Sequence, residues 1–174
     1  MINRSYKLLC GIACVVFLLI NSLTLHAQRP YETAIGARLG GTSGFTIKHM
    51  YKPSMTFEGI VGGFANGFSV TGLIEKNLPA FNEKGLSWYY GGGGHLAAYN
   101  GRNMYYNRFG REVDYRERND IGFGINGIIG LEYRLPDNVP VAFSVDLKPF
   151  IEFSTFGNVG MAMDPSVGVK FIIK

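Results

Sequence analysis

Histidine and serine are the residue types in this chain that could carry out acid–base or nucleophilic chemistry, and their spacing gives that chemistry little support. Of the three histidines, His26, His49 and His95, only His95 lies in the middle of an alternating apolar and polar segment, on its polar side. A lone histidine there is more often a hydrogen-bonded interior residue than a base or a ligand, since a zinc site needs three or four clustered ligands. Ser69 or Ser144 could meet it only across the interior. The sequence therefore predicts no catalytic, metal or cofactor site.

Four consecutive glycines lie in the segment WYYGGGGHLAAYN, from Trp88 to Asn100. A nucleotide-binding loop would continue with Lys and Ser or Thr after the glycines, and this segment does not. Its residues alternate instead, with Trp88 and Leu96 on one side and Tyr89 and His95 on the other. We therefore expect the glycine run to be the middle of a strand, with Trp88 near one rim and His95 inside.

The N-terminus has the pattern of a secretory signal peptide. Arg4 and Lys7 precede an apolar run from Leu8 to Ile20, which is shorter than the roughly 20 residues that a membrane-spanning helix needs. We expect residues 1–27 to be removed as a signal peptide and residues 28–174 to form the mature protein. Retention of the segment as an anchor is the alternative.

The two cysteines, Cys10 and Cys14, both lie in that apolar run. The residues before Cys14 loosely resemble a lipobox, but most of the apolar run follows this cysteine, so lipidation is the weaker interpretation. Removal of the segment leaves the mature chain without cysteine. Disulfides, thiol catalysis and cysteine metal sites are then excluded together.

The composition is that of one β-rich domain. Charged residues make up 17% of the 174 residues, aromatic residues make up 14%, and there are 24 glycines. The net charge of +4 falls to +2 without Arg4 and Lys7, because 15 basic residues then face 13 acidic ones. Binding of nucleic acid through charge is therefore not indicated.

After the signal region, apolar residues recur with a period of two to the end of the chain, as they do in β-strands, and no helix is expected. Pro149 and Pro165 lie inside the last two of these segments, and because proline removes a ladder donor we expect a bulge or a shortened strand at each. The predicted strands are 31–40, 44–51, 55–64, 67–77, 86–99, 120–134, 141–153 and 162–173.

One face of these strands is apolar, and the other combines small residues with charges of both signs. A soluble barrel would bury the apolar face and show a highly charged one to water, whereas here the five basic and six acidic side chains nearly balance. An apolar face against hydrocarbon explains why only Lys76, near a strand end, is charged there, since Arg or Lys costs roughly 2–4 kcal/mol at mid-depth. The polar residues expected in the barrel lumen are Glu32, Arg38, Lys48, Glu58, Glu75, His95, Glu132, Arg134, Asp146, Lys148, Glu152 and Lys170.

Aromatic residues on the apolar face gather near the end of the strands that carries the proline-rich turns, where an aromatic girdle at headgroup level belongs. Backbone polar groups in lipid must all be paired, so the strands must close on themselves. The sequence therefore predicts an all-β fold, an eight-stranded antiparallel transmembrane β-barrel. Its expected girdle is Tyr31, Tyr51, Trp88, Tyr133 and Phe171.

The signal peptide, the amphipathic strands and the terminal SVGVKFIIK together resemble the small outer-membrane β-barrel proteins common in Bacteroidota, with OmpA/OmpX-type architecture. The assembly signal of that family runs polar, any, Gly, two of any kind, apolar, any, apolar, and Ser166, Gly168, Phe171 and Ile173 occupy those places. The resemblance implies export through the periplasm to the outer membrane. It also implies recognition of this segment by the barrel-assembly machinery.

The connection 101–120 is the longest and most charged in the chain. It mixes tyrosine with arginine, a composition enriched in recognition surfaces. It is extracellular if the termini are periplasmic, and we expect its arginines to meet lipopolysaccharide phosphates, with a specific protein partner as the alternative. The residues concerned are Arg102, Tyr105, Tyr106, Arg108, Arg111, Tyr115, Arg116 and Arg118.

An eight-stranded barrel is only just wide enough for its own interior side chains, so a generous pore is not expected. The sequence favours a non-enzymatic integral outer-membrane protein with a structural, adhesive or narrow-pore role. Two other classes stay open: a lipid-modifying barrel enzyme that depends on His95, and a soluble periplasmic barrel that binds a small apolar ligand.

Overall fold

The computed structural model describes residues 32–64, 67–81, 83–99, 120–136, 139–155 and 159–173. The expected signal peptide, Tyr31 and the loop residues expected to meet lipopolysaccharide, from Arg102 to Arg118, lie outside these ranges. Eight strands follow one another: β1 Thr33–Gly40, β2 Ser43–Lys52, β3 Met55–Phe64, β4 Gly67–Pro79, β5 Leu86–Tyr99, β6 Asp120–Arg134, β7 Val141–Ser154 and β8 Val159–Ile172. Among the described residues, no helix is both long enough and apolar enough to cross a membrane.

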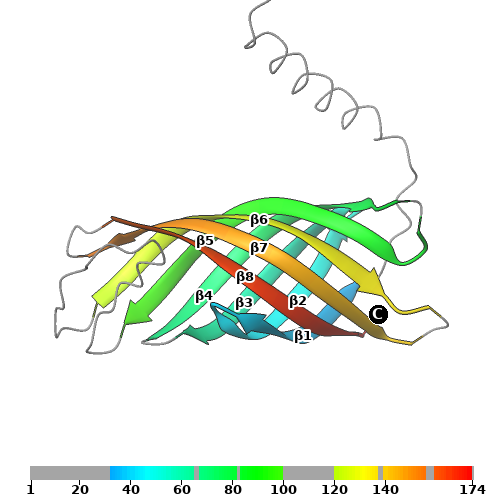
Figure 1. Cartoon of the computed structure of the whole chain (residues 1–174), viewed down its shortest axis with the longest axis horizontal. Helices are drawn as coiled ribbons and strands as arrows, with labels where there is room; N and C mark the ends of the chain where they lie inside the picture. Colours follow the sequence, from blue (N-terminus) through cyan, green and yellow to red (C-terminus); the bar gives the residue numbers. More distant parts are fainter. Residues whose placement is uncertain are drawn as a thin grey trace, which may run out of the picture.

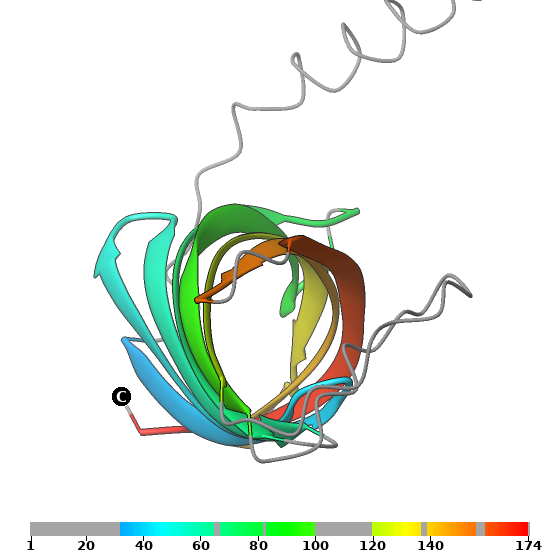
Figure 2. The same cartoon turned by 90° about the vertical axis from the view of Figure 1, so that its left-hand side faces the viewer.

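Each strand pairs in antiparallel fashion with the next, and β1 pairs with β8, so the sheet closes into a barrel (Figures 1 and 2). The closing seam runs from Ala34 opposite Ile172 to Gly40 opposite Ser166. The predicted eight-stranded antiparallel all-β barrel is thus confirmed.

The period-two pattern explains the wall, because successive side chains of a strand point to opposite faces. In β2, Thr46, Lys48 and Met50 are buried, while the residues between them are exposed. The same alternation continues around the barrel, with polar residues buried inside and large apolar side chains exposed outside. This distribution is the reverse of that in a soluble domain.

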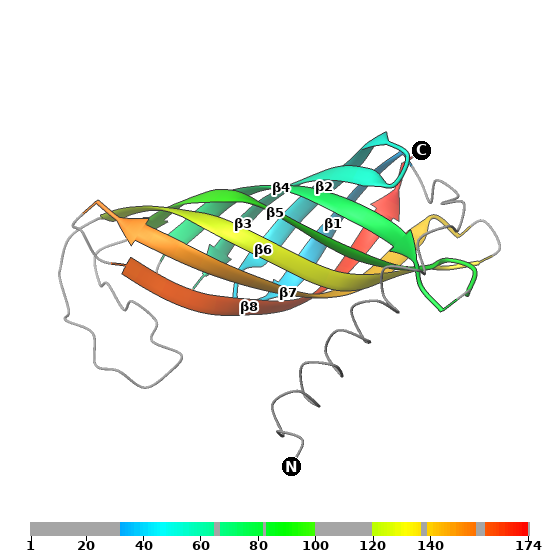
Figure 3. The same ribbon diagram turned by 90° about the horizontal axis from the view of Figure 1, so that it is seen from above.

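The two ends of the barrel differ in their connections. At the terminal end, where β1 begins and β8 ends, lie the connections 53–54, 80–85 and 135–140; at the loop end lie 41–42, 65–66, 100–119 and 155–158. The terminal end is on the right in Figure 1, beside the C-terminus. Strands β5 to β8 form one side of the barrel wall, and Figure 3 shows that they run obliquely to the barrel axis.

The two prolines do not produce the expected bulges or shortened strands. Both β7 and β8 run through them without a change of register, and the one register shift in the sheet lies between β2 and β3, at Met50 to Lys52. Opposite Pro149, the β6–β7 pairing pauses between Asn126–Phe150 and Ile129–Leu147, then resumes in the same register. The prediction was wrong, because the proline at 149 interrupts the ladder only locally and does not change the register.

Pro165 shows the same point at the closing seam. Its carbonyl oxygen accepts a bond from the Gly41 N–H, so the side of β8 that lacks the proline donor faces β1. The last β1 residue paired with β8 is Gly40, opposite Ser166. The strand therefore accommodates proline just beyond the end of its neighbour.

The glycine run is the middle of β5. Gly91 to Gly94 pair on one side with Glu75, Ile74, Leu73 and Gly72, and on the other side with β6. A Cβ on Gly93 would overlap the carbonyl oxygen of Gly72, and one on Gly91 would overlap that of Ile74. Glycine is needed at both positions because β4 and β5 approach closely where the wall curves.

Candidate functional site in the barrel interior

Most of the polar residues that the sequence placed in the lumen are buried there. Two are not: Glu32 precedes β1 and Arg134 is the last residue of β6, and both are exposed at the terminal end. The barrel wall ends at these positions, so their side chains are exposed. The buried members are Arg38, Lys48, Glu58, Glu75, His95, Glu132, Asp146, Lys148, Glu152 and Lys170.

One group, which we call the crossing cluster, consists of Lys48, Lys170, Glu58, Glu75 and Glu132. The Lys48 Nζ lies 2.8 Å from Glu75 Oε2 and 3.6 Å from Glu132 Oε2. The Lys170 Nζ lies 3.0 Å from Glu132 Oε2 and 3.5 Å from Glu58 Oε1. Each ammonium therefore bridges two carboxylates.

The crossing cluster spans the lumen. Lys48 is on β2 and Glu132 is on β6, which are opposite strands of an eight-stranded ring. The Tyr89 ring fills the space beside them, with the Lys48 Nζ 3.8 Å from its centroid. Lys48 and Tyr89 have no exposed surface at all. The side chains of two opposite walls thus meet and fill the interior at this level.

A second group, the wall cluster, consists of Arg38, Asp146, Lys148 and Asp164. Arg38 Nη2 lies 3.0 Å from Asp146 Oδ1 and 3.7 Å from Asp164 Oδ2, and Lys148 Nζ lies 3.2 Å from Asp164 Oδ2. Its members belong to β1, β7 and β8, which are neighbours around the ring. This cluster ties adjacent strands together along one side.

Asp164 was missed by the sequence analysis, although a signal was present. It lies an even number of residues before Lys170, so the alternation puts both on the inner face. Asp164 Oδ1 also accepts a bond of 2.9 Å from the Thr42 N–H and so holds the β1–β2 connection. The bulge or shortened strand expected at Pro165 does not form, so the alternation extends through Asp164.

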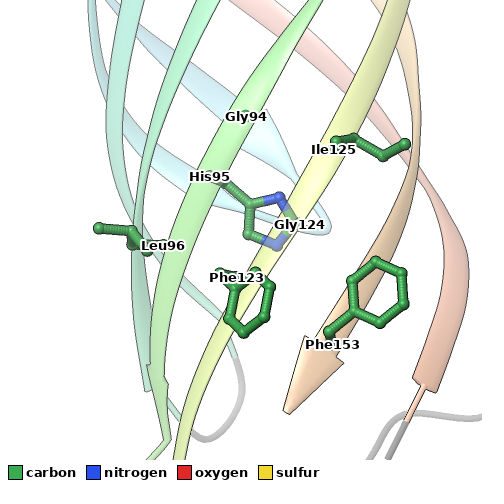
Figure 4. A pocket seen from close by; sticks show the side chains of 7 residues that line it. All are labelled: Gly94, His95, Leu96, Phe123, Gly124, Ile125 and Phe153. Atoms are coloured by element: carbon green, nitrogen blue, oxygen red, sulfur yellow. The ribbon is translucent and has the colours of Figure 1, made fainter. Parts of the chain in front are cut away.

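The third group, the rim cluster, surrounds His95 near the loop end. The His95 Nε2 lies 2.9 Å from Glu152 Oε2, its Nδ1 lies 2.6 Å from Asn126 Oδ1, and the Tyr99 hydroxyl donates to Glu152 Oε1. Gly124 makes room for the imidazole, because a Cβ there would overlap the ring (Figure 4). His95 is thus held on both ring nitrogens.

Neither serine considered as a partner of His95 is bonded to it, although Ser69 lies on the neighbouring strand, opposite Ala97, and not across the lumen as expected. The Ser144 hydroxyl is 3.5 Å from Lys170 Nζ, in the crossing cluster. Ser69 is buried on β4, and His95 contacts Asn126 and Glu152 instead. In the described ranges, no group of three or more His, Cys, Asp or Glu side chains is arranged to hold a metal ion. The interior geometry pairs charges and does not present a nucleophile to a base.

The outer surface carries the described residues of the expected girdle and two of the four residues of the assembly signal. Tyr51, Trp88, Tyr133 and Phe171 all lie near the terminal end, and Tyr51, Tyr133 and Phe171 are exposed. Ser166 points inward, where its hydroxyl donates to Asp146 Oδ1 over 2.9 Å. Phe171 and Ile173 are exposed and Gly168 pairs with Arg38 across the seam.

The outer wall also has a hollow between β5 and β6, which we call the β5–β6 depression. It is an open groove of about 380 Å³ between these two strands. Figure 4 shows Leu96, Phe123, Ile125 and Phe153 around it, with Gly94 and Gly124 on the strands between them. Its lining is almost wholly apolar, so it suits a hydrocarbon group better than a polar ligand.

A comparison with protein-family models finds no match for this chain, and neither does a comparison with curated proteins. Among solved structures, the chain is similar to the N-terminal β-barrel domain of Pseudomonas aeruginosa OprF, with a TM-score of 0.53 and 14% sequence identity. The match covers 80% of this chain and 95% of the OprF chain. At this level of identity the likeness concerns the fold.

Proposed function

We propose that this protein is an integral outer-membrane β-barrel with a structural, non-enzymatic role and a lumen closed by its own ion pairs. The observation that carries the proposal is the inverted distribution of side chains. Ten charged side chains and His95 are buried inside, whereas most outward positions of the described strands carry exposed apolar side chains. A soluble protein does not expose a continuous apolar belt of this kind, which disfavours the soluble periplasmic alternative.

The crossing cluster supports a structural role over a wide pore. Lys48 and Glu132 meet between opposite walls, and the Tyr89 ring packs against Lys48. An ion would have to displace paired charges to pass this level, and breaking a buried pair is costly. Narrow conduction therefore requires rearrangement of this cluster.

The rim cluster argues against the lipid-modifying alternative. Such chemistry would need His95 to activate a nucleophile beside lipid, whereas its nitrogens are occupied by Asn126 and Glu152 inside the wall. The expected Arg- and Tyr-rich connection at 101–120 supports an adhesive or lipopolysaccharide-binding surface outside the cell, if the terminal end is periplasmic. The C-terminal pattern from Ser166 to Ile173 supports delivery by the barrel-assembly machinery and an OmpA/OmpX-like type.

The test combines fractionation with conductance. We expect the protein in the outer-membrane fraction, with a gel mobility that changes on boiling, and we expect no steady current when it is reconstituted in planar bilayers. The double substitution Lys48→Ser with Glu132→Ser should raise the current, because it removes the pair that spans the lumen. The matched control is Lys52→Ser with Glu83→Ser, two exposed charges at the terminal end. A soluble protein whose mobility does not change on boiling would refute the proposal, and equal currents from both double variants would refute the closed lumen.

A further inference from the structure

Lys76 is the one charged residue at an outward position of the described strands. It lies on β4, opposite Met55 of β3 and Tyr90 of β5, and is half-buried. None of the carboxylates of the described residues forms an ion pair with its ammonium group. An ammonium group without a carboxylate partner in an apolar wall is a binding position for an anion from outside the chain.

The neighbours of Lys76 place it at the level of the lipid headgroups. Trp88 and Tyr90 are adjacent outward positions on β5, with ring centroids 5.2 Å apart. The Tyr51 hydroxyl lies 3.9 Å from the Met55 sulfur on the other side. Aromatic rings of this type collect at the membrane interface, where a lysine costs only about 0–1 kcal/mol. The anions available at that level are phosphates.

Beyond Tyr90, the outward face of β5 carries no side chains at Gly92 and Gly94, and it then reaches the β5–β6 depression. From Tyr90 to Gly94 the strand rises about 14 Å, at roughly 3.4 Å per residue. Half of the hydrocarbon core is about 15 Å. A lipid with its phosphate at Lys76 can therefore reach the depression with the end of one acyl chain.

We propose that Lys76 and the β5–β6 depression form one site for an anionic phospholipid, with its phosphate on the Lys76 ammonium and one acyl chain in the depression. The assignment rests on the proposed membrane location. The charge of Lys76 favours this occupant over a second copy of the chain, because the outward faces of the described strands offer no carboxylate to meet the lysine. It also orients the lipid, with its headgroup towards the terminal end.

Trp88 provides the test, because it is the only tryptophan in the chain and lies next to the site. The protein is reconstituted in phosphatidylcholine vesicles that contain a small fraction of phosphatidylglycerol, and bromine is attached to the acyl chains of one lipid at a time. We expect brominated phosphatidylglycerol to quench Trp88 about fivefold more efficiently, per lipid, than brominated phosphatidylcholine. Lys76→Gln should abolish that preference, and Lys52→Gln, at an exposed cation of the terminal end, should keep it.

A second substitution tests the part of the site that would hold the acyl chain. Ile125→Phe adds bulk to its lining and should lower the preference, whereas Ile129→Phe, at an outward position of the same strand outside the depression, should not. Equal quenching by the two lipids in the unaltered protein, or a preference that survives Lys76→Gln, would overturn the site. A protein that no brominated lipid quenches is not in the bilayer, and that result would overturn the proposed function as well.

Discussion

The crossing cluster and the wall cluster are built from the same kinds of charged side chain but connect different parts of the barrel. In the crossing cluster, two lysines face three glutamates drawn from β2, β3, β4, β6 and β8. In the wall cluster, one arginine and one lysine face two aspartates from β1, β7 and β8. The first joins opposite sides of the barrel. The second stays on one side, where two of its three pairs join strands that the backbone ladder already connects and the Arg38–Asp146 pair passes over one strand, β8.

This difference shows that the structural role of an ion pair depends on which strands it joins more than on which residue types form it. Neighbouring strands are held by backbone hydrogen bonds whether or not their side chains pair. Opposite walls have no such ladder, so only side chains can fix the distance between them. We therefore expect the crossing cluster to contribute more to stability and to control the width of the lumen, and the following substitutions compare the two clusters.

Lys170→Met should have the largest effect. It leaves Glu58 and Glu132 beside a single remaining ammonium, and removal of one partner from a buried ionic group costs about 3–5 kcal/mol. The free energy of unfolding in urea, measured on the protein in lipid vesicles, would fall by that amount, and Lys52→Met at an exposed site should change it little. A loss of unfolding free energy no greater than that of a wall-cluster variant would contradict the larger contribution of the crossing cluster.

Asp164→Asn should have an intermediate effect, about 2 kcal/mol. The amide removes the negative charge beside Arg38 and Lys148 but can still accept the bond from the Thr42 N–H. The same urea titration measures the loss. Planar-bilayer current should stay at the unaltered level, because this cluster does not cross the lumen. A rise in current would show that the wall cluster also limits the passage.

Gly93→Ala sharpens the comparison by disturbing the wall without touching a charge. Its Cβ would overlap the Gly72 carbonyl oxygen, so β4 and β5 must move apart, at a cost of roughly 1–2 kcal/mol. Gly127→Ala is the matched control, because its Cβ would meet only the Pro149 ring, at 3.4 Å. Equal unfolding free energies for the two variants would show that the close approach at Gly93 is not needed.

The sequence was sufficient for the strand order and for the inner face, because period-two alternation requires only local information. Lys48 and Glu75 are buried for that reason, and the glycine run lies in β5 as its alternation required. The pairing of Lys48 with Glu132 could not be predicted, since it depends on the tilt and register of strands on opposite walls. Asp164 was not predicted in the lumen, although the alternation of its strand extends to it. The exposure of Glu32 and Arg134 could not be predicted either, because it depends on how far the neighbouring strands extend.

The closing seam has a consequence for how the barrel is completed. Every other pairing joins consecutive strands through a local connection, whereas β1 and β8 bring together the two ends of the barrel sequence. Ser166, Gly168 and Phe171 form this seam, opposite Gly40, Arg38 and Ile35. A factor that holds β8 by the edge facing β1 occupies the same backbone groups that β1 needs. If such a factor assembles this barrel, its release and the pairing of β1 with β8 would be one competitive exchange of partners.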